Sequence, residues 1–135
     1  VTDREGSAVA CVLTMGAPFG LGRIARGTGV LLTPAPDPVS TLAMAAALLV
    51  NTNVNEMFFA GAAAGDAAAG PHLAALVAGG SLDRGTLEQA FAGLPPARAT
   101  RAHAISCPSG TPRRIETCTT RADPAGRGLA AFPGQ

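Results

Sequence analysis

The most informative stretch of the sequence consists of two apolar runs separated by a polar turn. The first run is LAMAAALLV at Leu42–Val50, the turn is Asn51–Asn53, and the second run is MFFA at Met57–Ala60. Alanine and methionine favour a helix by intrinsic propensity. The short length of the first run and the polar turn behind it favour a buried strand. We therefore predict two antiparallel strands joined by this turn.

The next segment, Gly61–Gly80, is rich in alanine and is predicted to contain a helix that ends at its last two glycines. Three apolar residues recur at helical spacing, namely Leu73, Leu76 and Val77. Asp66 is one candidate for the start of the helix, in which case Pro71 lies too deep and kinks it. The other candidate is a start near Gly70, with Pro71 in the first position.

A second helix is predicted after Thr86, which with Gln89 has the spacing of a capping box. Its apolar face consists of Leu87, Ala90, Phe91 and Leu94. Pro95-Pro96 ends it, because a proline disfavours helical geometry in the residue before it.

The last part of the chain is typical of a closing hairpin. Its predicted strands are His103–Cys107 and Ile115–Thr119, and a turn after them leads into a last short strand at Leu129–Ala131. Cys107 and Cys118 lie on facing arms of the hairpin. This placement is compatible with a cross-strand disulfide, which implies an oxidising compartment, and equally with two small buried thiols.

The first fourteen residues are predicted to form another hairpin, with strands at Val1–Thr2 and Ser7–Thr14 around the turn Asp3–Gly6. Alternation places three residues on one face, namely Val9, Cys11 and Leu13. We expect Cys11 to face the core as an inert small residue. Glycine and proline then interrupt residues 16–38, which leaves a short strand at Val30–Leu32 and an extended loop behind it.

The composition excludes several classes of protein. The chain has 135 residues, of which 47% are hydrophobic and 14% charged, the reverse of a disordered chain. Its net charge of +1 gives no basic surface for nucleic acid. Its longest apolar run is far shorter than the roughly 20 residues that a membrane-spanning helix needs. The three cysteines and two histidines form no CxxC or HxxxH pattern, so we predict neither a metal site nor a cofactor.

Other candidate sites are weaker. His103 and Cys107 share one face of a strand, but four residues span roughly 13 Å, which is too far for a catalytic hydrogen bond. The glycine-rich stretch Gly61–Gly70 lacks the Lys-Ser/Thr pair of a phosphate-binding loop. We expect His72 to lie on the surface and Arg113-Arg114 to occupy a solvated turn.

Three segments of the sequence resemble the small subunit of the γ-glutamyltransferase family, whose members are N-terminal-nucleophile hydrolases. Val1–Ala10 is similar to the opening hairpin of that subunit. Phe19–Gly22 followed by Gly27–Leu32 is similar to its next glycine-rich stretch, and Ala122–Gly128 followed by Leu129–Ala131 is similar to its end. The spacing of the first two segments is the most specific part of the likeness.

The resemblance implies an α+β fold, with this chain as part of a four-layer αββα sandwich of mainly antiparallel sheets. Residues 1–135 would form a single incomplete domain, completed by a large subunit from the same precursor. The family is often exported, so a periplasmic or extracellular location is compatible with the likeness, although no signal peptide is visible in this chain.

The resemblance also implies a reaction. A threonine exposed by self-cleavage attacks a γ-glutamyl or related amide, such as that of glutathione, forms an acyl-enzyme and passes the acyl group to water or an amine. Its own α-amino group has a pKa of about 7.7–8.0 and serves as the general base. In the family this threonine lies roughly five residues before the position that matches Val1. No cofactor is required.

Several site residues follow from the same likeness. Thr14 matches the threonine that hydrogen-bonds and orients the nucleophile. Ala64 and Gly65 fall near two glycines whose backbone N–H groups bind the oxyanion, a role that an alanine also fills where its dihedral angles allow. Substrate-binding positions are Gly16, Asp37, Ser40 and Thr41.

The sequence departs from the family at the substrate-binding positions. Gly16 stands where the family has an asparagine, and Ala35 and Pro38 stand where it has acidic or amide residues, with Asp37 as the neighbouring substitute. The segment 94–101 also lacks a strand and a helix of the family. Two functions are compatible with this pattern, an amidohydrolase or acyltransferase and a catalytically degenerate member that serves as a structural or binding partner.

Overall fold

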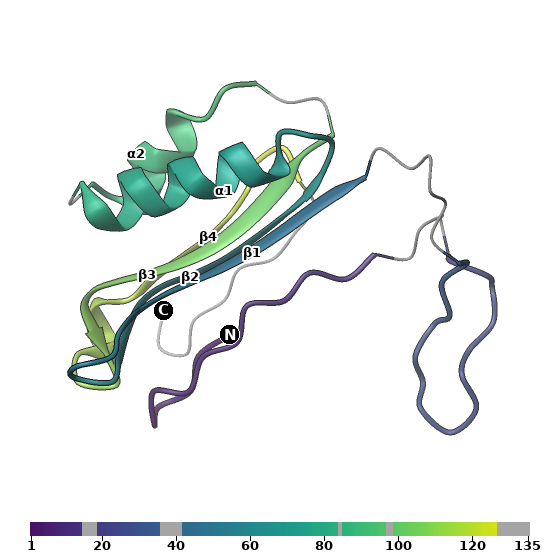
Figure 1. Ribbon diagram of the computed structural model, residues 1–135, viewed down its shortest axis with the longest axis horizontal. Coiled ribbons are helices and arrows are strands. Elements are labelled where there is room, and N and C mark those ends of the chain that lie inside the picture. Colours follow the sequence, from purple (N-terminus) through teal and green to yellow (C-terminus); the bar gives the residue numbers. More distant parts are fainter. Residues whose placement is uncertain (15–18, 36–41, 84, 97–98, 127–135) are drawn as a thin grey trace.

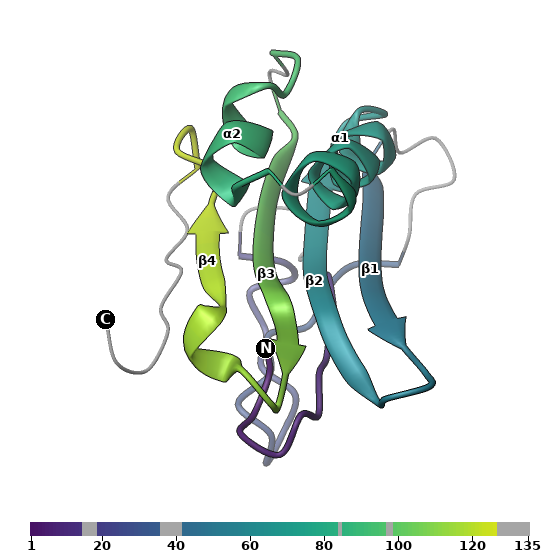
Figure 2. The ribbon, with the colours of Figure 1, turned by 90° about the vertical axis from the view of Figure 1, so that its left-hand side faces the viewer.

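A four-stranded antiparallel sheet with two helices across one face forms the protein (Figures 1 and 2). The computed structural model describes residues 1–14, 19–35, 42–83, 85–96 and 99–126. In chain order its elements are β1 (Ala43–Asn51), β2 (Glu56–Gly65), α1 (Ala69–Val77), a π-helical turn (Ala78–Leu82), α2 (Leu87–Ala92), β3 (Arg101–Thr111), a 3-10 turn (Ile115–Thr117) and β4 (Thr119–Ala122). The strands lie in the order β1-β2-β3-β4, so the predicted α+β class is confirmed.

The two apolar runs form the β1–β2 hairpin, as predicted. Ala43 lies opposite Gly65 and Asn51 lies opposite Glu56. Along β1, half-buried and exposed side chains alternate, and the half-buried ones pack under the helices. The helix propensity of alanine is overridden because small side chains let other elements approach β2 closely from both faces. For the same reason β2 extends through Ala64 to Gly65, beyond its predicted end.

The main core lies between the helices and the sheet. Its large buried members are Phe59, Leu73, Leu76, Leu87 and Phe91. Leu73 and Leu76 confirm the predicted apolar face of the first helix, but that helix begins at Ala69, between the two predicted starts, with Pro71 in its first turn. The predicted capping box of α2 is confirmed, since the side chains of Thr86 and Gln89 each accept a hydrogen bond from the backbone N–H of the other.

The closing hairpin differs from the prediction in its second arm. Residues 115–117 form a 3-10 turn rather than a strand, and β4 begins only at Thr119. Of the two alternatives for the cysteines, the structure has the disulfide between Cys107 and Cys118. This bond removes Cys107 as a nucleophile. The predicted last strand lies outside the described residues.

Residues 1–14 form a hairpin, here called the N-terminal hairpin, on the outer face of the sheet, away from α1 and α2 (Figure 1). Val1 and Val9 exchange two backbone hydrogen bonds of 2.8 and 2.9 Å, and Thr2 pairs with Ala8. The predicted orientation of its second arm is wrong. Cys11 is exposed, together with Val9 and Leu13, whereas Ala8 packs against the cluster on the outer face of the sheet.

Residues 21–32 form a narrow loop that projects away from the sheet (Figure 1). The predicted strand at Val30–Leu32 is reduced to one bridge between Ile24 and Leu31, flanked by backbone hydrogen bonds. Within the described residues, no helix has the length and apolar character needed to cross a bilayer.

Candidate functional site

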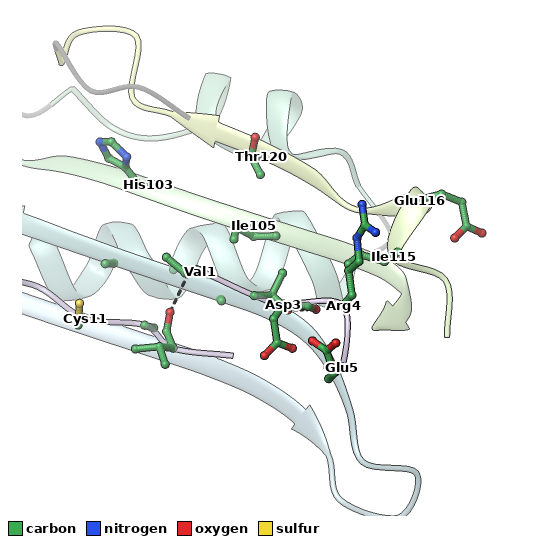
Figure 3. A pocket seen from close by; sticks show the side chains of 16 residues that line it. Val1, Asp3, Arg4, Glu5, Cys11, His103, Ile105, Ile115, Glu116 and Thr120 are labelled. Carbon is green, nitrogen blue, oxygen red and sulfur yellow. Dashed lines mark hydrogen bonds between the residues drawn. The ribbon is translucent and has the colours of Figure 1, made fainter. Parts of the chain in front are cut away.

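A cavity of about 930 Å³ lies between the N-terminal hairpin and the outer face of the sheet (Figure 3). Its floor is formed by Ala60 and Ala62 of β2 and by His103 and Ile105 of β3. The hairpin supplies the opposite wall. The hairpin therefore lies over the sheet without filling the space between them.

The polar side chains that line this cavity lie in two groups, one toward each end. Figure 3 shows His103 and Cys11 toward one end and Asp3, Arg4, Glu5 and Glu116 toward the other. Among the described residues, no group of three or more His, Cys, Asp or Glu side chains is arranged to hold a metal ion. The lining includes Val1 but not Thr14, Ala64 or Gly65.

Thr14 lies on the second arm of the N-terminal hairpin. Val1 pairs with Val9, and residues 8–14 continue outward with alternating half-buried and exposed side chains, as an extended strand does. Thr14 is half-buried. It lies five residues beyond Val9, the residue that pairs with Val1.

Ala64 and Gly65 lie at the end of β2. Ala64 is held in the ladder between Met44 and Arg101, and Gly65 lies one residue beyond the last β2–β3 pair. Gly65 has φ +146°. A Cβ atom there would stand 2.5 Å from the carbonyl oxygen of Ala99 and from the Cα of Thr100, so only glycine fits.

The carboxylate of Asp66, the residue after Gly65, accepts a hydrogen bond from Thr100 that was not predicted from the sequence. Asp66 Oδ1 accepts a 2.5 Å hydrogen bond from the hydroxyl of Thr100, which is buried, and one of 3.0 Å from the N–H of Ala68. These bonds, the one from Thr100 above all, lower the pKa of Asp66 below its ordinary value. From the sequence, Asp66 was predicted only as a candidate start of the helix, because Thr100 lies 34 residues further along the chain.

Replacing Thr100 by valine is expected to raise the pKa of Asp66 toward its ordinary value, since valine keeps the shape and removes the donor. A lowered folded-state pKa stabilises the protein above the unfolded pKa of about 3.9, and this contribution is lost as the pH falls through the folded-state value. The variant should therefore unfold at a lower temperature than the parent at pH 7, and the difference should shrink below about pH 4. Thermal unfolding at pH 7 and pH 3 measures this, and an equal difference at both would contradict it.

His72 is buried rather than on the surface, which corrects the prediction. It lies in the first turn of α1 and is 4% exposed, and neither ring nitrogen has a hydrogen-bond partner among the described residues. With Thr100, Arg101 and Asp123 it lines a smaller cavity of about 260 Å³. Arg113 and Arg114 do lie in an exposed turn, as predicted.

The substrate-binding positions predicted from the sequence are not described by the structure. Gly16, Asp37, Ser40 and Thr41 lie outside the described residues, as does Pro38. Ala35 is described and is exposed.

Comparison of the whole chain with known proteins gives matches at the level of structure. No protein-family model and no curated protein sequence matches the chain. A gamma-glutamyltranspeptidase from Pseudomonas nitroreducens, complexed with L-DON, superposes with a TM-score of 0.66 and 15% identity over 98% of this chain and 96% of that chain. The fold is similar to that of gamma-glutamyltranspeptidase.

A highly active W525D mutant of the same Pseudomonas nitroreducens gamma-glutamyltranspeptidase gives an equal TM-score of 0.66 at 15% identity, over 100% of this chain and 97% of that chain. The likeness to gamma-glutamyltranspeptidase therefore extends over nearly the whole of both chains. It agrees with the α+β fold that the resemblance in the sequence implies.

Proposed function

We propose that the chain is the small-subunit portion of a γ-glutamyltransferase-like amidohydrolase or acyltransferase. Its substrates would be γ-glutamyl amides or related small amides, and its nucleophile would be a threonine five residues before Val1, exposed by self-cleavage. The observation that supports this proposal most strongly is the register of the N-terminal hairpin, because an upstream segment that continued this register would lie opposite Thr14 at that position.

The register and the family resemblance are independent of one another. The resemblance assigns a nucleophile roughly five residues upstream and makes Thr14 its hydrogen-bond partner. The register given by the backbone hydrogen bonds between Val1 and Val9 would, if it continues upstream of Val1, lead to the same pairing without reference to any family. Cross-strand neighbours lie about 4.5–5.5 Å apart, so a hydroxyl on Thr14 is within reach of a threonine at that position.

The proposed reaction has two stages. The upstream threonine hydroxyl attacks the γ-carbonyl carbon, and its own α-amino group accepts the proton. Backbone N–H groups at Ala64–Gly65 would stabilise the tetrahedral oxyanion, and the amine leaves with the returned proton. Water or a second amine then attacks the acyl-enzyme and restores the threonine. Thr14 orients the nucleophile throughout.

A large subunit from the same precursor is the proposed partner. Among the described strands, β1 pairs with β2 alone, so it is an edge strand. On its outer face the apolar side chains of Met44, Leu48 and Val50 are each about half exposed to solvent. A long, uncharged edge strand of this kind is normally covered by another element. The disulfide between Cys107 and Cys118 supports a periplasmic or extracellular location.

The second candidate function is a non-catalytic partner that keeps the scaffold. It is favoured by Gly16, Ala35 and Pro38, which offer no polar side chain at positions where the family holds its substrate. The two candidates differ in the upstream residue, because a partner protein needs no threonine there.

Turnover of a chromogenic γ-glutamyl anilide by the protein carrying its upstream sequence tests the proposal. We expect release of the aniline in the active form, and none after replacement of the upstream threonine by alanine. An intact precursor without turnover would exclude the catalytic function and favour the partner.

A further inference from the structure

We propose that the disulfide between Cys107 and Cys118 positions the N-terminal hairpin and thereby the proposed catalytic pair. The residues enclosed by this bond, 107–118, are here called the disulfide loop. The catalytic consequence rests on the proposed function, whereas the mechanical consequence is a property of this chain alone.

The hairpin packs on a small cluster on the outer face of the sheet. The buried members of this cluster are Met57, Ala60, Cys107 and Cys118, and the partly buried ones are Ala8, Ile105 and Ile115. Ala8 is the member from the hairpin. The two cysteines are 0% and 2% exposed, so the disulfide belongs to the buried part of the cluster against which Ala8 packs.

The turn of the hairpin also contacts the disulfide loop directly. Gly6, at φ +93°, lies so near Pro112 that an added Cβ atom would stand 2.5 Å from the Cδ of the proline. The same loop is fixed to the start of β2 by a 2.9 Å ion pair between Arg113 and the buried carboxylate of Glu56. The loop therefore connects the hairpin turn to the sheet.

Both arms of the hairpin also line the large cavity, through residues 1–5 and 9–11. The contacts with the disulfide loop and with the cluster therefore help to set the position of the hairpin relative to the sheet. Since Val1 and Thr14 belong to the two arms of the hairpin, a displaced turn would shift the proposed nucleophile and Thr14 relative to the sheet. A shift of about 1 Å at a catalytic group is enough to lower a rate by about 10²-fold.

Reduction gives a direct way to release the loop. A dithiol attacks one sulfur through its thiolate, the S–S bond breaks, and two electrons and two protons are transferred, so that two cysteine thiols form and the dithiol closes to a cyclic disulfide. The double substitution Cys107→Ala with Cys118→Ala removes the bond permanently. A Cys11→Ala background prevents the remaining thiol from forming new disulfides.

Hydrogen exchange in the full protein tests the mechanical part. We expect the amides of Asp3 and Val9, which donate to Ser7 and Val1, to exchange at least about tenfold faster without the disulfide. Amides in the centre of β2 and β3 should keep their protection. Arg114→Ala, which removes an exposed ion pair from the same loop, is the matched control and should change neither set.

A glycine pair tests the contact without touching the cysteines. Gly6→Ala should speed exchange in the hairpin because its Cβ displaces the turn from Pro112, whereas Gly27→Ala, also at positive φ but with no atom within 4 Å of its Cβ, should not. Unchanged hairpin exchange in both the disulfide-free protein and Gly6→Ala would overturn the proposal.

The catalytic part has its own readout. We expect kcat on the γ-glutamyl anilide to fall at least about tenfold without the disulfide, with KM within about twofold, because orientation rather than binding is lost. A KM that rises while kcat is retained would contradict positioning. If no form of the protein turns over the anilide, the proposed function fails, and the exchange measurement still decides whether the disulfide holds the hairpin.

Discussion

Replacing Gly65 by alanine is expected to destabilise the protein by about 3 kcal/mol or more, which lowers the Tm by roughly 10 °C. The added methyl group would stand 2.5 Å from backbone atoms of Ala99 and Thr100, which have no rotamer to move away. At φ +146° the alanine is also strained by its own backbone. The steric clash and the backbone strain both arise at the end of β2, next to the hydrogen bond between Asp66 and Thr100.

Gly70→Ala is the matched control for this prediction. Gly70 lies in the first turn of α1, and an added Cβ meets nothing within 4 Å. Its replacement should stabilise the helix by about 0.5–1 kcal/mol. Thermal unfolding of the two variants in the full protein measures the contrast, and a Gly65→Ala variant as stable as the parent would show that the strand end is not as close to Thr100 as described.

Replacing Thr14 by valine is expected to lower kcat by about 10²-fold and to leave KM nearly unchanged. Valine keeps the shape and the β-branch of threonine but has no hydroxyl, so the strand is retained while the orienting hydrogen bond to the nucleophile is lost. Steady-state kinetics on a γ-glutamyl anilide measures both constants.

Thr14→Ser separates the hydroxyl from the methyl group. The serine variant should keep most of the kcat, because the hydroxyl that orients the nucleophile is still present. Equal loss in the serine and valine variants would assign Thr14 a packing role, and no loss in either would remove it from the proposed site.

The elements of the fold that depend on local sequence patterns could be predicted. The β1–β2 hairpin followed from two apolar runs around a polar turn, and α2 followed from the Thr86–Gln89 capping box. The extension of β2 through Ala64 could not be predicted, because alanine fits a helix and a crowded strand equally well. The prediction of a strand for the second arm of the closing hairpin was wrong for a different reason. β-branched residues such as those at 115–119 also occur in a tight turn, which here is held by a disulfide.

The candidate site was less predictable from residue patterns. The inward face of residues 8–14 was assigned to Val9, Cys11 and Leu13, which are exposed, whereas Ala8 packs on the sheet. Burial of His72 and the Asp66–Thr100 bond depend on how β3 and α1 meet, which no local pattern records. Thr14 was identified only by family resemblance, and its role stays a prediction.

The mass of the mature small chain tests the central claim most directly. The protein should be expressed from its precursor and the intact chains measured by mass spectrometry with sequencing of the new N-terminus. We expect a chain that begins with threonine five residues before Val1, the position opposite Thr14. An uncleaved precursor, or a new N-terminus at any other residue, would contradict the proposed nucleophile.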